Sequence, residues 1–127
     1  MPKHDLLFMV RVMIADDSDD MRQALGSVIQ MGNHELVAEA SDGMEAMEKF
    51  MTTNPDVLLL DVTMPKKDGL TVLKEIIMSK PNAKIIMLTG NEDLLTIHKS
   101  SADGAQAYLM KPFDIKDVLD AITMVVS

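Results

Sequence analysis

The chain has 127 residues, enough for a single domain with a buried core, and 47% of them are hydrophobic and 25% charged, as in ordinary globular domains. Its formal net charge of −8 disfavours direct binding to nucleic acid or to an anionic membrane surface, because both are negatively charged. There is no cysteine, which excludes disulfides and cysteine metal ligands, and no apolar run approaches the roughly 18 residues of a membrane span. We therefore expect one cytoplasmic domain covering residues 1–127, without membrane or nucleic-acid partners.

Apolar runs and amphipathic segments alternate along the whole chain, and their periodicities predict a regular series of elements. In chain order these are a strand at 7–15, a helix at 18–32, a strand at 35–40, a helix at 43–53, a strand at 56–61, a helix at 69–79, a strand at 83–89, a helix at 91–104, a strand at 105–110 and a helix at 114–126. Such alternation predicts an α/β, doubly wound (βα)5 domain whose parallel sheet is covered by helices on both faces. An irregular α+β domain is the alternative.

Two of the predicted helices have unusual apolar faces. In 43–53 the residues at helical spacing are Met44, Met47 and Met51, which we expect to face the core, and 91–104 has the weakest apolar stripe of all. The chain contains 13 methionines, and we expect them to act mainly as flexible core filler; an adaptable surface for partner proteins is the alternative. Surface positions are expected for the three histidines, His4, His34 and His98.

Four of the five predicted strands end in a reactive polar residue. The first ends in Asp16 and Asp17, the third in Asp61, the fourth in Thr89 and the fifth in Lys111. Ligands of open α/β sheets bind at the carboxyl ends of the strands, so we expect these side chains to share one site. Three carboxylates in one crevice repel each other, and one lysine cannot neutralise them all. A hard divalent cation such as Mg²⁺ fits, since it is bound by carboxylates and bridges to phosphate oxygens.

Other acidic residues near the strand ends have structural explanations. Asp19 and Asp20 fall in the first turn of a helix, where the helix dipole favours negative charge. Ser18 or Asp19 can cap that helix, and Asp114 can cap the last one. The segment 41–43, Ser-Asp-Gly, reads as a cap and turn after the second strand. These residues are therefore not assigned to the metal site.

Asp16-Asp17 and the segments "DVTMPKKDG" (61–69), "LTG" (88–90), "GAQAY" (104–108) and "KPF" (111–113) occur in this order behind the predicted strands. Together they resemble the receiver domain of two-component response regulators, most closely the stand-alone CheY type, over about residues 8–126. The resemblance implies a flavodoxin-like sheet of strand order 2-1-3-4-5. It also implies a phosphorylation-activated switch rather than an enzyme. A sensor histidine kinase or phosphotransfer protein would donate the phosphoryl group, and a downstream effector protein would respond.

The resemblance implies a role for each residue of the predicted site. Asp61 would be the nucleophile that accepts the phosphoryl group as an acyl phosphate. Mg²⁺ would be bound by Asp17, Asp61 and the backbone carbonyl of Thr63, with Asp16 acting through a water molecule. Lys111 would hold a phosphoryl oxygen, as cations do in phosphoryl-transfer sites.

Further implied roles concern the switch and the backbone. Thr89 would reach another phosphoryl oxygen, and Tyr108 would be its aromatic switch partner. Movement of these two side chains would re-dock the fourth helix and change the surface formed by the fourth helix, fifth strand and fifth helix, about residues 92–126. The family has a cis peptide bond before the residue at Pro112. Gly69 fits a position that needs a permissive backbone.

The lifetime of the phosphoryl group and the wider context of the domain stay open. Thr63 and Asn91 occupy the two positions that tune this lifetime in the family. The domain can act alone, act as a phosphorelay intermediate, or be the input domain of a larger regulator. A Mg²⁺-dependent aspartyl phosphatase is a rival, but it needs a second aspartate where this chain has Thr63. A flavodoxin is disfavoured because "ADDSDD" lacks the hydroxyls and glycines of a phosphate-binding loop.

Overall fold

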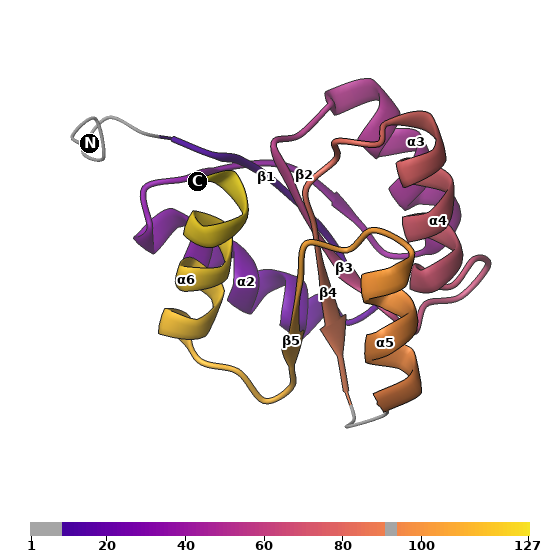
Figure 1. The fold of residues 1–127 in the computed structure, drawn as a ribbon. Helices are drawn as coiled ribbons and strands as arrows, with labels where there is room; N and C mark the ends of the chain where they lie inside the picture. Colours follow the sequence, from indigo (N-terminus) through magenta and orange to yellow (C-terminus); the bar gives the residue numbers. More distant parts are fainter. Residues whose placement is uncertain (1–8, 91–93) are drawn as a thin grey trace.

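Five strands alternate with five helices in the structure, a computed structural model that describes residues 9–90 and 94–127 (Figure 1). In chain order the elements are β1 (Arg11–Ala15), α2 (Asp19–Met31), β2 (Glu35–Ala40), α3 (Gly43–Thr53), β3 (Val57–Asp61), α4 (Gly69–Ser79), β4 (Ile85–Thr89), α5 (Leu94–Ala102), β5 (Ala107–Met110) and α6 (Ile115–Val126). The ten elements predicted from the sequence are confirmed. The main differences are shorter first, fourth and fifth strands and a shorter fourth helix.

The five strands form one parallel sheet of order β2-β1-β3-β4-β5, which confirms the predicted order 2-1-3-4-5. β3 lies at the centre, and all five of its residues are buried. This explains its continuous apolar sequence, because a central parallel strand is covered on both faces. Asp61, its last residue, lies in register with Leu88 of β4, so the carboxyl ends of β3 and β4 meet at one edge of the sheet.

Helices cover both faces of the sheet (Figure 1). On one face, α2 and α6 bury residues such as Leu25 and Ile122 against the strands. On the other face, α3 and α4 bury residues such as Phe50 and Ile76, and α5 lies beside α4. Alternate residues of each strand point to the two faces, so the chain forms two hydrophobic cores that share the sheet. No helix among the described residues is long and apolar enough to cross a membrane.

The inward face of α3 differs from the prediction. Its buried residues are Gly43, Ala46 and Phe50, whereas Met44 and Met51 are 55% and 45% exposed. The helix is thus rotated by about one residue from the face that hydropathy selects. Small residues at this contact allow the helix to approach the loop after β3 closely, and methionine side chains there would hold the two apart.

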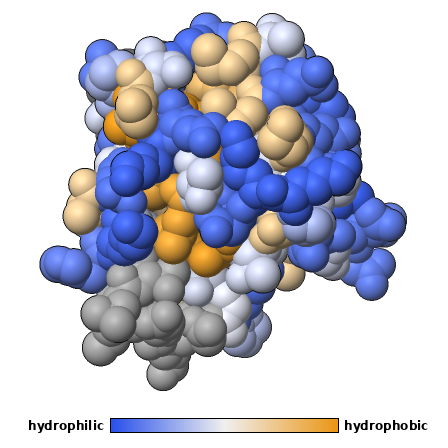
Figure 2. Space-filling view, turned by 90° about the vertical axis from the view of Figure 1, so that its right-hand side faces the viewer, coloured by the Kyte–Doolittle hydropathy of each residue, from blue (hydrophilic) through white to orange (hydrophobic). Residues whose placement is uncertain are grey.

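Most methionines among the described residues are exposed, so the prediction that they mainly fill the core is wrong. Met13, Met64 and Met87 are buried, whereas seven are exposed: Met9, Met31, Met44, Met51, Met78, Met110 and Met124. On the side of the molecule that carries α3, α4 and α5, hydrophilic residues cover most of the surface and apolar residues form small separate areas (Figure 2). The exposed methionines are distributed over several elements rather than confined to one helix.

Side-chain caps begin the helices where the sequence predicts them. Ser18 accepts a hydrogen bond from the amide of Met21, and Asp42 accepts one from the amide of Glu45. Asp114 forms a reciprocal capping box at the start of α6. These caps satisfy amides that lack a partner in the first helical turn.

The prediction that the three histidines lie on the surface is confirmed for one of them and wrong for another. His98 is exposed, as expected, and His4 lies outside the described residues. His34 is half-buried, and its Nδ1 accepts a hydrogen bond of 3.2 Å from the amide of Val10, so the prediction of a plain surface residue is wrong there. Burial lowers the pKa of this imidazole.

Candidate functional site

Three carboxylates meet at the carboxyl ends of β1 and β3. Asp16 and Asp17 follow β1, and Asp61 is the last residue of the neighbouring β3. One oxygen from each of them lies within 4.8 Å of the others. The structure therefore brings these three carboxylates together, because β1 pairs in parallel with β3.

Asp16 is the most restrained of the three. Its side chain is fully buried, and its Oδ1 accepts a hydrogen bond of 2.9 Å from the amide of Ser18. Its Oδ2 lies 3.3 Å from the ammonium nitrogen of Lys111. Asp17, one residue later, is exposed. The cluster is thus closed on the Asp16 side and open to solvent on the Asp17 side.

Lys111 brings an ammonium group among these carboxylates. It directly follows β5, and its amide donates a hydrogen bond of 2.8 Å to the carbonyl oxygen of Thr89 at the end of β4. Its Nζ lies 3.3 Å from Asp16 and 3.6 Å from Asp61. The Lys111–Pro112 peptide bond is cis, as the family resemblance implied. A residue 95 positions from Asp16 therefore reaches the site through the pairing of β4 with β5.

The electrostatic cost of the cluster falls on Asp61. Its pKa is raised from 3.8 to about 6, first by burial and then by the charge of Asp16, while Lys111 acts in the opposite direction. Its side chain is 8% exposed, and its Oδ1 accepts a long hydrogen bond of 3.4 Å from the amide of Thr63. One ammonium thus compensates only part of the repulsion, as the sequence suggested.

This arrangement suits a hard divalent cation. All the donors in the cluster are carboxylate oxygens, which Mg²⁺ prefers, and one side of the cluster is open for the water molecules that the ion keeps. The raised pKa of Asp61 means that a further positive charge beside it would be favourable. Asp17 and Asp61 are therefore suited to hold the ion, with buried Asp16 behind them.

The remaining predicted residues lie at different distances from this cluster. Thr89 is buried at the end of β4, one position past the residue that pairs with Asp61. Tyr108 is 46% exposed on β5, which excludes a core role. Thr63 is exposed two residues after Asp61, and Asn91 lies outside the described residues. The structure therefore places Thr89 and Thr63 at the same end of the sheet as the carboxylates, and it leaves Tyr108 at the surface.

The loop after β3 depends on two glycines whose role was not foreseen. A Cβ at Gly69 would lie 1.9 Å from the carbonyl oxygen of Asp61, and a Cβ at Gly43 would lie 1.8 Å from that of Lys67. Gly69 does not have a positive φ, so the prediction that it needs a permissive backbone is wrong: it is needed for space. The amide of Gly69 donates to the carbonyl of Val62 at 2.7 Å, which closes the loop beside Asp61.

Arg22 is a further residue that the sequence analysis missed. Its Nη1 donates a hydrogen bond of 2.6 Å to the backbone carbonyl of Asp16, and its side chain forms ion pairs with Asp19 and with Glu39. Its position in the sequence could have indicated this role, because Arg22 lies one helical turn after the cap Ser18 and can therefore reach the end of β1. Arg22 therefore orients the backbone of Asp16, whose side chain faces the site.

Comparison with known proteins agrees with this geometry. The model of the response regulator receiver domain matches residues 12–123. The chemotaxis protein CheY of Thermotoga maritima is 36% identical over 115 residues, which cover 91% of this chain and 96% of CheY. The transcriptional regulatory protein PdtaR of Mycobacterium tuberculosis is 39% identical over 117 residues, which cover 92% of this chain but 57% of PdtaR.

Solved structures place the chain in the same group. A chain of the CheX–CheY–BeF3–Mg²⁺ complex from Borrelia burgdorferi superposes with a TM-score of 0.92 and 30% sequence identity, covering 98% of this chain and 95% of that one. The CheY4 chemotaxis protein of Vibrio cholerae superposes with a TM-score of 0.85 and 31% identity, covering 93% and 99% of the two chains. The match extends over nearly the whole length of both relatives. The protein therefore belongs to the family of response regulator receiver domains, of the CheY type.

Proposed function

We propose that this receiver domain is a Mg²⁺-dependent switch in which Asp61 accepts a phosphoryl group from a histidine kinase or phosphotransfer protein. One observation carries the proposal: the carboxylates of Asp16, Asp17 and Asp61 lie within 4.8 Å of one another, beside the ammonium of Lys111. The chain acts on itself rather than on a separate substrate, and the location we propose is cytoplasmic. The relative from Borrelia burgdorferi, crystallised with Mg²⁺ and BeF3, supports the metal requirement.

The chemistry needs little from the protein beyond positioning and charge. A carboxylate oxygen of Asp61 attacks the phosphorus of a phosphohistidine, the phosphorus–nitrogen bond breaks, and its electron pair returns to the imidazole of the partner. Lys111, 3.6 Å from Asp61, neutralises charge on the transferred group. When bound, Mg²⁺ would supply further neutralisation and orient the phosphoryl oxygens. Asp17 and Asp61 would hold it, together with the carbonyl of Thr63.

The proposal is tested with a small phosphodonor. Incubation with acetyl phosphate and Mg²⁺ should add one phosphoryl group, seen as a mass increase that is stable in acid and labile in base. Asp61→Asn should abolish the addition. Asp56→Asn changes a carboxylate at the other end of β3 and should not abolish it. The proposal is wrong if the phosphate maps to a serine or threonine, or if chelation of Mg²⁺ leaves the reaction unchanged.

We further propose that phosphorylation changes the surface formed by α5, β5 and α6. β5 is an edge strand, and its Tyr108 and Met110 are 46% and 40% exposed, as is Met124 of α6 at 62%. An exposed apolar area beside an unpaired strand edge suits a protein partner. Thr89 connects this surface to the site, because its carbonyl accepts from Lys111 and it pairs with Met110.

This coupling has its own test. With acetyl phosphate and Mg²⁺, amide NMR signals should move near Asp61 and also along α5, β5 and α6. Thr89→Ala should retain phosphorylation but lose the distal movements. If the distal movements survive in this variant at full size, Thr89 does not couple the site to the surface, although the phosphoacceptor assignment would stand.

The output of the switch is a separate question. The similar proteins include chemotaxis proteins of nearly the same length and a transcriptional regulator of which this chain spans 57%. We propose an effector protein as the direct partner, because the domain has a net charge of −8, which repels nucleic acid. Thr63 and Asn91 would set how long the phosphoryl group persists.

A further inference from the structure

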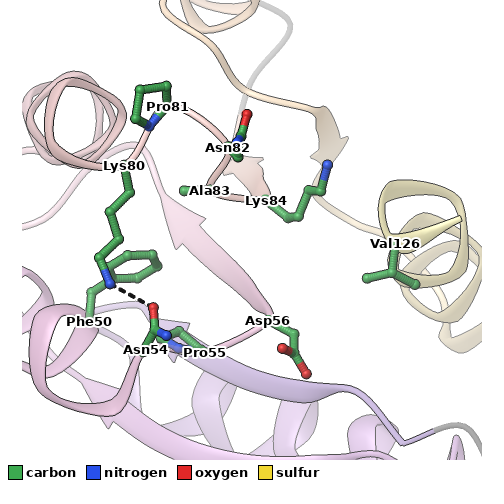
Figure 3. A pocket seen from close by; sticks show the side chains of 10 residues that line it. All are labelled: Phe50, Asn54, Pro55, Asp56, Lys80, Pro81, Asn82, Ala83, Lys84 and Val126. Atoms are coloured by element: carbon green, nitrogen blue, oxygen red, sulfur yellow. Dashed lines mark hydrogen bonds between the residues drawn. The ribbon is translucent and has the colours of Figure 1, made fainter.

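At the amino-terminal end of the sheet, opposite Asp61, lies a cavity of about 550 Å³ that the proposed switch does not use. It opens between the C-terminal ends of α3 and α4 and the segments that lead into β3 and β4 (Figure 3). Its volume falls within the range of about 300–1,000 Å³ that is typical of small-molecule sites. The apolar part of its lining comes from Phe50, Pro55, Pro81, Ala83 and Val126.

The charged groups around this cavity are mostly positive, although the protein as a whole is acidic. Lys80 and Lys84 line it, and Asp56 is the one acidic residue among its lining side chains. The guanidinium of Arg11 lies next to this lining, because it donates to the carbonyl oxygen of the lining residue Asn54 at 2.8 Å and to that of Thr53 at 2.9 Å. Such a local excess of positive charge attracts anions even when the net charge is negative.

The pairing of the basic residues sharpens this observation. Most lysines and arginines in the described part of the chain form an ion pair with another described residue. Four do not: Arg11, Lys74, Lys80 and Lys84. Two of these four line the cavity and Arg11 donates to its lining residue Asn54, so most of the cations that lack a carboxylate partner within this part of the chain lie at or next to the cavity.

The two lysines lie in different parts of the cavity lining. Lys80 donates a hydrogen bond of 2.6 Å to Oδ1 of Asn54, and its ammonium lies 5.9 Å from the centre of the Phe50 ring. This bond uses one of the three donors of the ammonium. Lys84 lies between Ala83 and Val126, away from Lys80 (Figure 3). Both lysines are half-buried, so their methylene groups add to the apolar lining.

We infer that this cavity binds a small organic anion, a carboxylate or phosphate attached to an apolar ring. The ring would contact Phe50 and the prolines, and the acid group would accept a hydrogen bond from Lys84, because Lys80 already donates to Asn54. The excess of positive charge disfavours a metal cation, and the volume of about 550 Å³ is that of a small-molecule site. Because the site lies at the far end of β3 and β4 from Asp61, its occupant does not compete with a phosphodonor.

The test uses naphthalene-2-sulfonate, an aromatic anion that cannot donate a phosphoryl group to Asp61. Titration followed by amide NMR should give saturable movements at Asn54 and at residues 80–84. Lys84→Gln should weaken binding about five- to tenfold, the value of one partly exposed charge-assisted hydrogen bond. Lys74→Gln, which removes the same charge from the fourth unpaired lysine or arginine, should leave the affinity unchanged.

Three results would overturn the inference. The first is the absence of saturable movement at residues 80–84. The second is equal binding of the sulfonate to wild type and Lys84→Gln, with both proteins shown to be folded by circular dichroism. The third is a stronger response to an acidic peptide than to the sulfonate, which would make the cavity part of a protein-binding surface. Asp61→Asn should bind the sulfonate like wild type, so this test is independent of the phosphoacceptor proposal.

Discussion

The substitution Asp61→Asn is expected to stabilise the metal-free protein, although it removes the proposed phosphoacceptor. In the structure, burial and the charge of Asp16 raise the pKa of Asp61 from 3.8 to about 6. Because one pKa unit is worth about 1.36 kcal/mol, this rise corresponds to about 3 kcal/mol of unfavourable free energy when Asp61 is ionised in the folded state. Asparagine has nearly the same shape and carries no charge, so it avoids most of this cost.

The pH dependence follows from the same values. The folded-state pKa lies above the unfolded one, so the folded state holds more protons between about pH 3.8 and pH 6. The destabilising contribution of Asp61 is therefore absent below this window, grows as the pH rises through it, and is complete above pH 6. The advantage of Asp61→Asn over wild type should be largest at pH 7.5 and should disappear near pH 4.

Urea denaturation in the presence of EDTA at pH 7.5 and at pH 4 measures this effect. At pH 7.5 we expect the variant to be more stable by about 1–3 kcal/mol, or several degrees in Tm for a domain of this size. Asp20→Asn, which changes an exposed carboxylate of α2, is the matched control and should have a much smaller effect. A variant that is no more stable than wild type at pH 7.5, or equally stabilised at both pH values, would refute the reasoning.

Three further results are expected. Saturating Mg²⁺ should raise the Tm of wild type and of Asp20→Asn, since a ligand at about 100 times its Kd adds about 2.7 kcal/mol of stability. It should raise the Tm of Asp17→Asn much less, and equal shifts would exclude Asp17 as a ligand. Gly69→Ala should lower the free energy of unfolding by more than about 2 kcal/mol, because its Cβ would overlap a backbone carbonyl, whereas Gly90→Ala, whose Cβ would meet nothing within 4 Å, should change it little in denaturant titrations. The imidazole of His34 should titrate in NMR with a midpoint below 6.5, because it is half-buried; a midpoint at or above this value would contradict the burial.

Much of the site could be predicted because parallel sheets impose a simple rule. Asp16, Asp61 and Thr89 each directly follow or end an apolar run, and the carboxyl ends of parallel strands lie at one edge. Position in the sequence therefore translates directly into position in space. The length of β3 and its unbroken apolar character likewise reflect burial on both faces, which sequence patterns record well.

The failures share a different cause. In α3, hydropathy favours Met44 and Met51, but the helix turns Gly43 and Ala46 inward, and at Gly43 the loop after β3 comes too close for a side chain. Gly69 was predicted to provide backbone freedom, yet a glycine is needed there because the carbonyl oxygen of Asp61 leaves no space for a Cβ. Both features depend on the distance between two segments far apart in the chain, and neither hydropathy nor local periodicity contains that distance.

The acidic site is held in place by its neighbours rather than by its own carboxylates. The buried side chain of Asp16 receives a backbone amide and Lys111, while its carbonyl oxygen receives Arg22. Asp61 has only a long hydrogen bond and a more distant contact with Lys111, so it is the carboxylate whose ionisation is disfavoured. A metal ion beside Asp61 would therefore relieve a cost that the fold already contains. For this reason the residue least favourably charged in the resting protein is also the one at which added positive charge has the largest effect.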